Sequence, residues 1–123
     1  MTKNIAIFAS GRGSNAQKII DYFRHQEEVA VRLIVTNKAT APVLDIAEKE
    51  GISSLVISKD SFYQTEHLLL ELQQFQIDFV VLAGFLWLIP AYLVTAYDKK
   101  IVNIQPALLP NYGGKGMYGK KVH

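Results

Sequence analysis

The chain has 123 residues, which suits one α/β domain or a large part of one. Half of the residues are hydrophobic and 20% are charged, so the composition excludes a disordered or collagen-like chain. The net charge of +2 gives no argument for a nucleic-acid partner, and the absence of cysteine excludes disulfides and thiolate metal sites and fits a cytoplasmic location.

In chain order, apolar runs alternate with segments of helical periodicity. The first apolar run stops at Ser10 and is too short to span a membrane, so we expect no membrane partner. Pro42 and Gly51 favour the start and the end of the second helix, and Ser61 is a candidate N-cap of the third. The expected strands are residues 4–9, 29–35, 53–57, 78–83 and 101–104, and the expected helices are residues 15–25, 41–50, 61–76 and 90–97.

This alternation predicts a Rossmann-like parallel α/β sheet with helices on both faces. Residues 111–119 form a glycine-rich loop, and residues 119–123 resemble the start of a helix. We therefore expect residues 1–123 to be a single α/β domain that is incomplete at its C-terminus. A truncated sheet leaves an unpaired edge and uncovered apolar surface, which favours association.

The segment SGRGSN at residues 10–15 joins the first strand to the first helix. Gly11 and Gly13 allow a sharp turn and a close backbone approach, and the helix that follows offers free N–H groups to an anion. We expect a phosphate-binding loop here, with Ser14 and Asn15 as side-chain donors. The competing interpretation is a tight turn in which Ser14 or Asn15 only caps the helix.

A dinucleotide site is a sharper alternative, because Gly11, Gly13 and Ala16 fit the pattern G-x-G-x-x-A. That fingerprint expects an acidic residue after the second strand, where this sequence has TNK at residues 36–38. Because the carboxylate that would bind the ribose is missing, the one dinucleotide alternative left is an NADP site that uses Lys38. A phosphorylated small molecule is therefore the favoured ligand.

Two further segments follow strands at the same edge of the predicted sheet. Residues 83–90, AGFLWLIP, could line a slot for a flat heterocycle, although on pattern alone ordinary core packing is the better interpretation. Residues 103–110, NIQPALLP, place Asn103 and Gln105 on one side of a strand, although a polar strand end explains them too.

Together these segments and TNKA at residues 36–39 resemble the phosphoribosylglycinamide formyltransferases of the folate-dependent formyltransferase family. The resemblance implies the formyltransferase fold and transfer of a formyl group from 10-formyltetrahydrofolate to the amine of glycinamide ribonucleotide, in de novo purine (IMP) synthesis. It implies no metal, and it implies a monomer or homodimer. By the family pattern, the phosphate is bound by Gly13, Ser14 and Asn15, the folate by Leu86, Trp87, Leu88, Ile89 and Asn103, and Asn103 and Gln105 hold the catalytic positions.

The sequence departs from the family at residue 105, where the catalytic histidine is replaced by Gln105. A glutamine amide can donate a hydrogen bond to an oxyanion, but it cannot exchange a proton near neutral pH. The family's aspartate has no counterpart before residue 123, and His25, His67 and His123 are expected at the surface or the chain end. A non-catalytic ribonucleotide-binding module of the same fold therefore stays open as an alternative.

Overall fold

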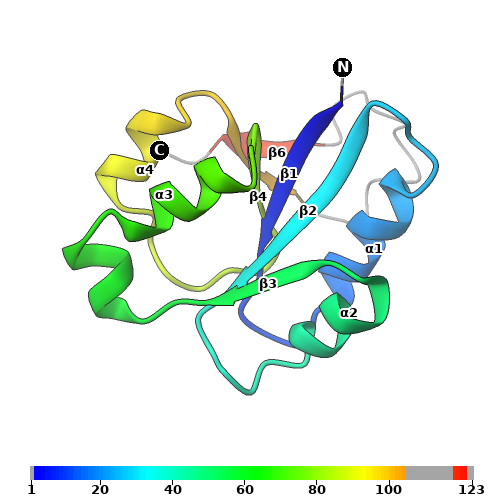
Figure 1. The fold of residues 1–123 in the computed structure, drawn as a ribbon, viewed down its shortest axis with the longest axis horizontal. Helices are drawn as coiled ribbons and strands as arrows, with labels where there is room; N and C mark the ends of the chain where they lie inside the picture. Colours follow the sequence, from blue (N-terminus) through cyan, green and yellow to red (C-terminus); the bar gives the residue numbers. More distant parts are fainter. Residues whose placement is uncertain (1, 105–117, 122–123) are drawn as a thin grey trace.

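The computed structural model describes residues 2–104 and 118–121 (Figure 1). The strands in these ranges are β1 (Lys3–Phe8), β2 (Val29–Thr36), β3 (Ser53–Val56), β4 (Phe79–Leu82), β5 (Ile101–Ile104) and β6 (Tyr118–Lys121). The helices are α1 (Ser14–Phe23), α2 (Val43–Glu50), α3 (His67–Gln74) and α4 (Ala91–Ala96), with a π-helical turn η1 (Asp60–Gln64) before α3. The predicted alternation of strands and helices is confirmed.

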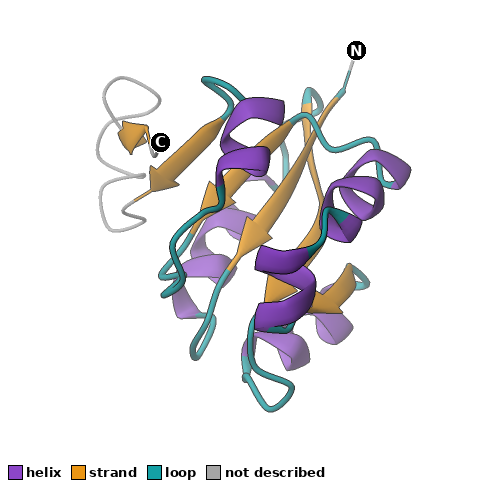
Figure 2. Cartoon of the chain, turned by 90° about the vertical axis from the view of Figure 1, so that its left-hand side faces the viewer, coloured by secondary structure: helices purple, strands orange, loops and turns teal. Residues whose placement is uncertain are grey.

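The sheet has the strand order β3-β2-β1-β4-β5-β6. Strands β1 to β5 pair in parallel, as the sequence predicts, and β1 is buried along nearly its whole length. Figure 2 shows the helices covering both faces of this twisted sheet. The predicted α/β class with helices on both faces is therefore confirmed.

The C-terminal end of the described chain corrects one prediction. Residues 118–121 form β6, which pairs antiparallel with β5, whereas the sequence predicted a glycine-rich loop to residue 119 and then a helix. The strand was not predicted because the GKK segment has no apolar pattern of its own. It becomes a strand because its backbone pairs with that of β5. Residues 105–117 and the expected loop within them lie outside the described residues.

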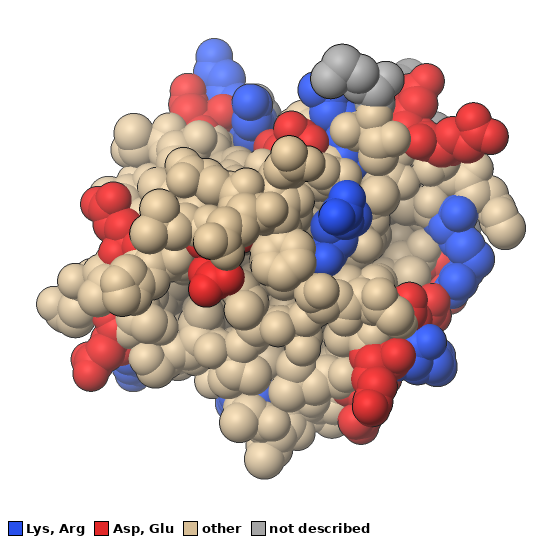
Figure 3. Space-filling view, in the orientation of Figure 1, with Lys and Arg blue, Asp and Glu red and all other residues tan. Residues whose placement is uncertain are grey.

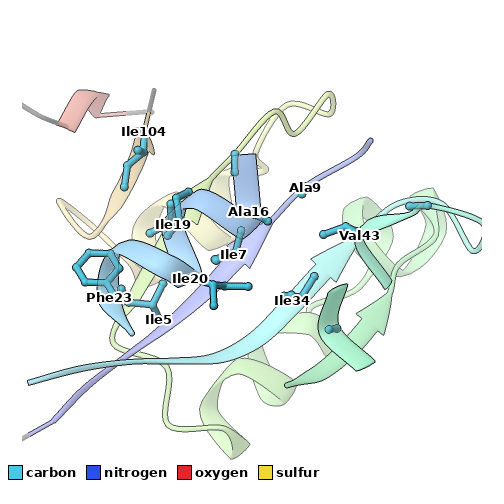
Figure 4. Close-up of a cluster of buried hydrophobic side chains, with 14 residues drawn as sticks. Ile5, Ile7, Ala9, Ala16, Ile19, Ile20, Phe23, Ile34, Val43 and Ile104 are labelled. Atoms are coloured by element: carbon cyan, nitrogen blue, oxygen red, sulfur yellow. The ribbon is translucent and has the colours of Figure 1, made fainter. Parts of the chain in front are cut away.

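Each face of the sheet carries its own hydrophobic core. On one face α1 and α2 pack Ile19, Ile20 and Val43 against strand residues such as Ile7 and Ile34 (Figure 4). On the other face η1, α3 and α4 cover the alternate residues of the same strands. The fully buried side chains that anchor this second core include Phe8, Leu33, Phe62, Leu72 and Leu93. The alternation along β1 thus places Phe8 and Ile7 in different cores.

The predicted helix at residues 61–76 is interrupted in the structure. Thr65 has extended backbone angles, φ −137° and ψ 171°, between η1 and α3. Its hydroxyl donates to the carbonyl of Ser61 at 2.8 Å and accepts from the N–H of His67 at 3.3 Å. This local competition with helical hydrogen bonding explains the break. Ser61 lies inside η1 and bonds Ser58, so its expected role as an N-cap is wrong.

An apolar hollow of about 290 Å³ lies beside α1 on the face of the first core. Its lining is almost wholly hydrophobic and comes from Lys3, Ile5, Phe23, Val29, Phe79, Val81, Val102 and Ile104. Val102 and Ile104 belong to β5, so the hollow extends to the strand beside β6.

A salt-bridged cluster joins the C-terminal ends of α1 and α2. The Arg24 guanidinium contacts the Glu50 carboxylate at 3.0 Å and Asp21 at 2.6 Å, and Gln17 also donates to Glu50. The hydrogen bond from Arg24 lowers the pKa of Glu50 to about 2. Elsewhere on the face seen in Figure 3, Lys and Arg side chains are interspersed with Asp and Glu, so neither sign dominates that view.

Candidate functional site at the switch point of the sheet

The strand order reverses direction between β1 and β4. From β1 the chain moves outward through β2 and β3, and it then returns to the other side of β1 with β4 and β5. In open parallel sheets, ligands bind outside the carboxyl ends of the strands at such a switch point. The two segments that leave this point are residues 10–15 after β1 and residues 83–90 after β4. The topology therefore brings together two of the three segments that the sequence singled out.

Gly13 is held in a conformation and a space that only glycine fits. It lies at the N-cap of α1 with φ 87° and ψ 3°, in the left-handed region. A Cβ atom there would lie 2.7 Å from Ile46 Cδ1 and 2.9 Å from the Cα of Val43. The start of α1 is thus pressed against α2, which fixes the direction in which the loop faces.

The first turn of α1 offers unused backbone donors. The first helical bond runs from the Gln17 N–H to the Gly13 carbonyl at 2.8 Å, and within the described residues no hydrogen bond uses the N–H groups of Ser14, Asn15 or Ala16. No side chain of the described residues caps the helix, and both Ser14 and Asn15 are exposed, so the interpretation of these residues as simple caps is wrong. Three free N–H groups at the positive end of a helix dipole suit an anion.

Ser10 joins the loop after β1 to the loop after β4. Its hydroxyl accepts the backbone N–H of Leu86 at 2.9 Å, and its own N–H donates to the Gly84 carbonyl at 3.4 Å. The side chain of Asn15 reaches the same place, since its Nδ2 lies 3.7 Å from the position of a Cβ on Gly84. Ser10 was not among the predicted site residues. Its burial, at 2% exposure, is set by the fold and leaves no signal in the sequence spacing.

Residues 85–89 alternate between the core and the solvent. Phe85, Trp87 and Ile89 are half-buried and pack against the second core, while Leu86 and Leu88 are 71% and 84% exposed. The Phe85 ring meets Phe8 edge-on at 5.4 Å, and Trp87 lies 5.9 Å from Phe62. The inward-facing Phe85, Trp87 and Ile89 confirm the core-packing interpretation, whereas the ligand slot stays a prediction.

Asn103 occupies the carboxyl end of β5 on the same face of the sheet as residues 85–89. The register places Phe8 beside Leu82 and Leu82 beside Asn103 across three parallel strands. The side chain of Asn103 is exposed. Asn103 therefore lies one strand away from β4 at the switch point, and its contribution to the site stays a prediction. Gln105 lies outside the described residues.

Other candidates are placed away from this centre or lack partners there. His25 and His67 are exposed, as predicted, and His25 follows α1 at the edge of the sheet opposite the carboxyl ends. Lys38 is exposed after β2, and within the described residues its hydrogen bonds come from the backbone: its N–H donates to the Thr36 hydroxyl and its carbonyl accepts from the N–H of Ala41. Across residues 2–104 and 118–121, no group of three His, Cys, Asp or Glu side chains is placed to hold a metal ion, and no helix is long and apolar enough to span a membrane.

The match to known proteins covers nearly the whole chain. Residues 3–122 match the family described as Formyl transferase. The chain belongs to the formyl transferase family. Its resemblance to one branch is specific: it is 44% identical over 128 residues to the chloroplastic phosphoribosylglycinamide formyltransferase of Arabidopsis thaliana, covering 98% of this chain and 44% of that protein. It is also 36% identical to the Escherichia coli (strain K12) phosphoribosylglycinamide formyltransferase, covering 90% of this chain and 55% of that protein.

Solved structures of the same branch share the fold. Glycinamide ribonucleotide transformylase 1 from Geobacillus kaustophilus superposes with a TM-score of 0.77 at 37% identity, covering 95% of this chain and 65% of that chain. Phosphoribosylglycinamide formyltransferase from Bacillus halodurans gives a TM-score of 0.74 at 36% identity, covering 94% of this chain and 62% of that one. The chain thus has the formyltransferase fold and spans about half the length of the curated relatives cited here.

Proposed function

We propose that this chain binds glycinamide ribonucleotide and a formylated tetrahydrofolate at the switch point, as the phosphoribosylglycinamide formyltransferases do by their name. The reaction proposed is transfer of the formyl group of 10-formyltetrahydrofolate to the ribonucleotide amine in purine (IMP) synthesis. The observation that carries this proposal is the direct joining of two family segments, residues 10–15 and 83–90, through Ser10 at the point where ligands bind in parallel sheets.

The ribonucleotide phosphate is assigned to the first turn of α1. Among residues 2–104 and 118–121 no group bonds the N–H of Ser14, Asn15 or Ala16, and the positive end of the α1 dipole favours a dianion. Arg12 is exposed in the same loop and makes no ion pair within the described residues. One positive charge and a set of oriented N–H groups are what a phosphate monoester requires.

The folate is assigned to residues 85–89, and two features of the structure fit it. The exposed Leu86 and Leu88 side chains offer apolar surface, which a flat heterocycle would cover. The backbone N–H groups of Trp87, Leu88 and Ile89 have no hydrogen-bond partner within the described residues, so they are available to the polar edge of the ring. The cosubstrate supplies the formyl group, and the protein supplies binding and orientation.

The chemistry needs a hydrogen-bond donor and a route for one proton. The ribonucleotide amine attacks the formyl carbon, the new carbon–nitrogen bond replaces the carbon–N10 bond, and one amine proton ends on N10. The Asn103 amide donates to the oxygen that gains negative charge during this attack. Gln105 offers a second amide donor but no titratable group, so the proton transfer loses its usual carrier.

Binding of the ribonucleotide tests the phosphate assignment directly. Calorimetry with glycinamide ribonucleotide should show binding by the wild-type chain and loss of binding in the Ser14→Ala, Asn15→Ala double variant. The matched control is Ser53→Ala, Ser54→Ala, which removes two exposed hydroxyls from β3 at the sheet edge. Equal affinity in the wild type and the loop variant would refute the proposed role of residues 10–15.

The second candidate function is a non-catalytic binding module of the same fold, which the glutamine at position 105 favours. Turnover distinguishes an enzyme from such a module. A formyl-transfer assay with 10-formyltetrahydrofolate gives formylated ribonucleotide if the chain is an enzyme. Binding of both ligands without product supports the module. Titration with NADP tests the remaining alternative, for which Lys38 stands where the fingerprint expects a carboxylate.

A further inference from the structure

Two tyrosine hydroxyls connect η1 to the chain that follows β4. The Tyr63 hydroxyl donates to the carbonyl of Leu88 at 2.6 Å. The Tyr92 hydroxyl donates in the opposite direction, from the start of α4 to the carbonyl of Phe62 at 2.8 Å. These two bonds, here called the tyrosine clasp, join segments that are 25 and 30 residues apart in the sequence.

We propose that Tyr63 is a positioning residue for folate binding, acting through the backbone of residues 85–89. This inference rests on the proposed function, because it takes that segment as the folate-binding surface. Tyr63 itself belongs to η1, outside the segments that carry the family resemblance. Its effect on the ligand is indirect and passes through the Leu88 peptide.

The hydrogen bonds of residues 85–89 show why the clasp matters. Within the described residues, the backbone of this segment has two recorded hydrogen bonds, from the Leu86 N–H to Ser10 and to the Leu88 carbonyl from Tyr63. The segment lies in no helix or strand, so no ladder holds it. Losing either bond frees one end of the surface that we assign to the folate.

The bond from Tyr63 also leaves a defined set of backbone groups for a ligand. It occupies the carbonyl of Leu88, and within the described residues the N–H groups of Trp87, Leu88 and Ile89 have no hydrogen-bond partner. These three N–H groups are the ones that we assign to the polar edge of the heterocycle.

Ring packing makes the clasp stiff. The Tyr63 ring lies 4.9 Å from Phe62, which is fully buried, and 6.1 Å from Trp87. The Lys59 ammonium lies 5.9 Å from the centre of the Trp87 ring, on the same turn of chain as Tyr63. The Trp87 side chain therefore packs the segment against η1, and it is the one tryptophan of the chain. Its fluorescence reports on the clasp without any ligand.

The test compares Tyr63→Phe with Tyr97→Phe. Both variants delete one hydroxyl that donates to a carbonyl, and the Tyr97 bond to Ile77, at 2.9 Å, lies before β4 and away from the segment. The probes are 5-formyltetrahydrofolate for residues 85–89 and inorganic phosphate for residues 10–15, both titrated by calorimetry, together with the Trp87 emission spectrum and anisotropy.

We expect Tyr63→Phe to weaken 5-formyltetrahydrofolate binding roughly three- to tenfold, the usual effect of one lost hydrogen bond, with lower Trp87 anisotropy and unchanged phosphate affinity. Tyr97→Phe should leave both affinities and the spectrum unchanged, although its urea midpoint falls. The positioning role is overturned if Tyr63→Phe binds 5-formyltetrahydrofolate with the same affinity as the wild type. It is also overturned if Tyr63→Phe and Tyr97→Phe weaken that binding equally. If the wild-type chain binds phosphate but no folate, the folate assignment itself fails and the positioning role fails with it.

Discussion

The Ser10 hydroxyl accepts the backbone N–H of Leu86 across 76 residues of sequence, at 2.9 Å. This bond connects the loop after β1 to the loop after β4, the two neighbouring strands at the switch point. The segments that we assign to the phosphate and to the folate therefore share one buried hydroxyl, so a change at Ser10 reaches both.

Replacing Ser10 with Ala should lower the free energy of unfolding by about 1 kcal/mol, since the Leu86 N–H loses its acceptor. The variant should also weaken 5-formyltetrahydrofolate binding. Urea unfolding and calorimetry measure the two effects. Ser61→Ala is the control, because that hydroxyl bonds only within its own turn and its loss should change stability by about 0.5 kcal/mol at most. Equal stability of the two variants would contradict the structural role of Ser10.

Replacing Gly13 with Ala should destabilise the chain by about 2 to 4 kcal/mol. The new methyl group meets Ile46 and Val43 below 3 Å, and the left-handed φ of 87° adds backbone strain. Gly11 in the same loop is the matched control, because a Cβ there meets nothing within 4 Å. Urea unfolding of both alanine variants measures the difference, and a Gly13→Ala protein as stable as Gly11→Ala would show that α1 does not press on α2.

The Arg24–Glu50 ion pair should make stability depend on pH in the acid range. The pKa of Glu50 falls from 4.5 to about 2 on folding, so the carboxylate stabilises the fold above pH 4.5, and this contribution declines as the pH falls and is gone below about 2. Urea midpoints of the wild type and Glu50→Gln, measured from pH 7 to pH 2, should therefore converge toward the acid end. A difference that stays constant with pH would contradict the assignment.

Restoring histidine at position 105 should raise the rate of formyl transfer by on the order of a hundredfold, because histidine supplies the missing proton carrier. The assay compares the wild type with Gln105→His at saturating ribonucleotide and 10-formyltetrahydrofolate. Gln105→Asn, which keeps an amide and gains no titratable group, is the control and should show no increase. Unchanged turnover in Gln105→His, with both ligands bound, would place this chain with the binding modules.

The strands and most helices could be predicted because their signals are local. The apolar run at residues 101–104 coincides with β5, and Gly51 ends α2 with φ 70°, in the left-handed conformation expected of a terminal glycine. The predicted helix at residues 61–76 failed at Thr65, whose hydroxyl competes for backbone bonds. The prediction for residues 118–121 failed because β6 forms by pairing with β5, which no local pattern indicates.

The candidate site divides in the same way. Gly13, Ser14, Asn15 and Asn103 lie in short motifs, so the sequence indicated them before any fold was known. Ser10 and Tyr63 act through contacts 76 and 25 residues distant, which no local pattern encodes. The cytoplasmic location, the single-domain organisation, the monomer or homodimer state and the role of Gln105 stay predictions.

The lack of room for a Cβ at Gly13, beside Val43 and Ile46, also bears on the thermodynamics of anion binding. A loop that rests against the side of α2 has few alternative conformations to lose, so the phosphate binding that we propose at Ser14 and Asn15 should carry a small conformational entropy cost. On this proposal the site is preorganised by helix packing and not by the anion. We therefore expect its affinity to depend on how closely α1 and α2 pack, at a distance from the ligand.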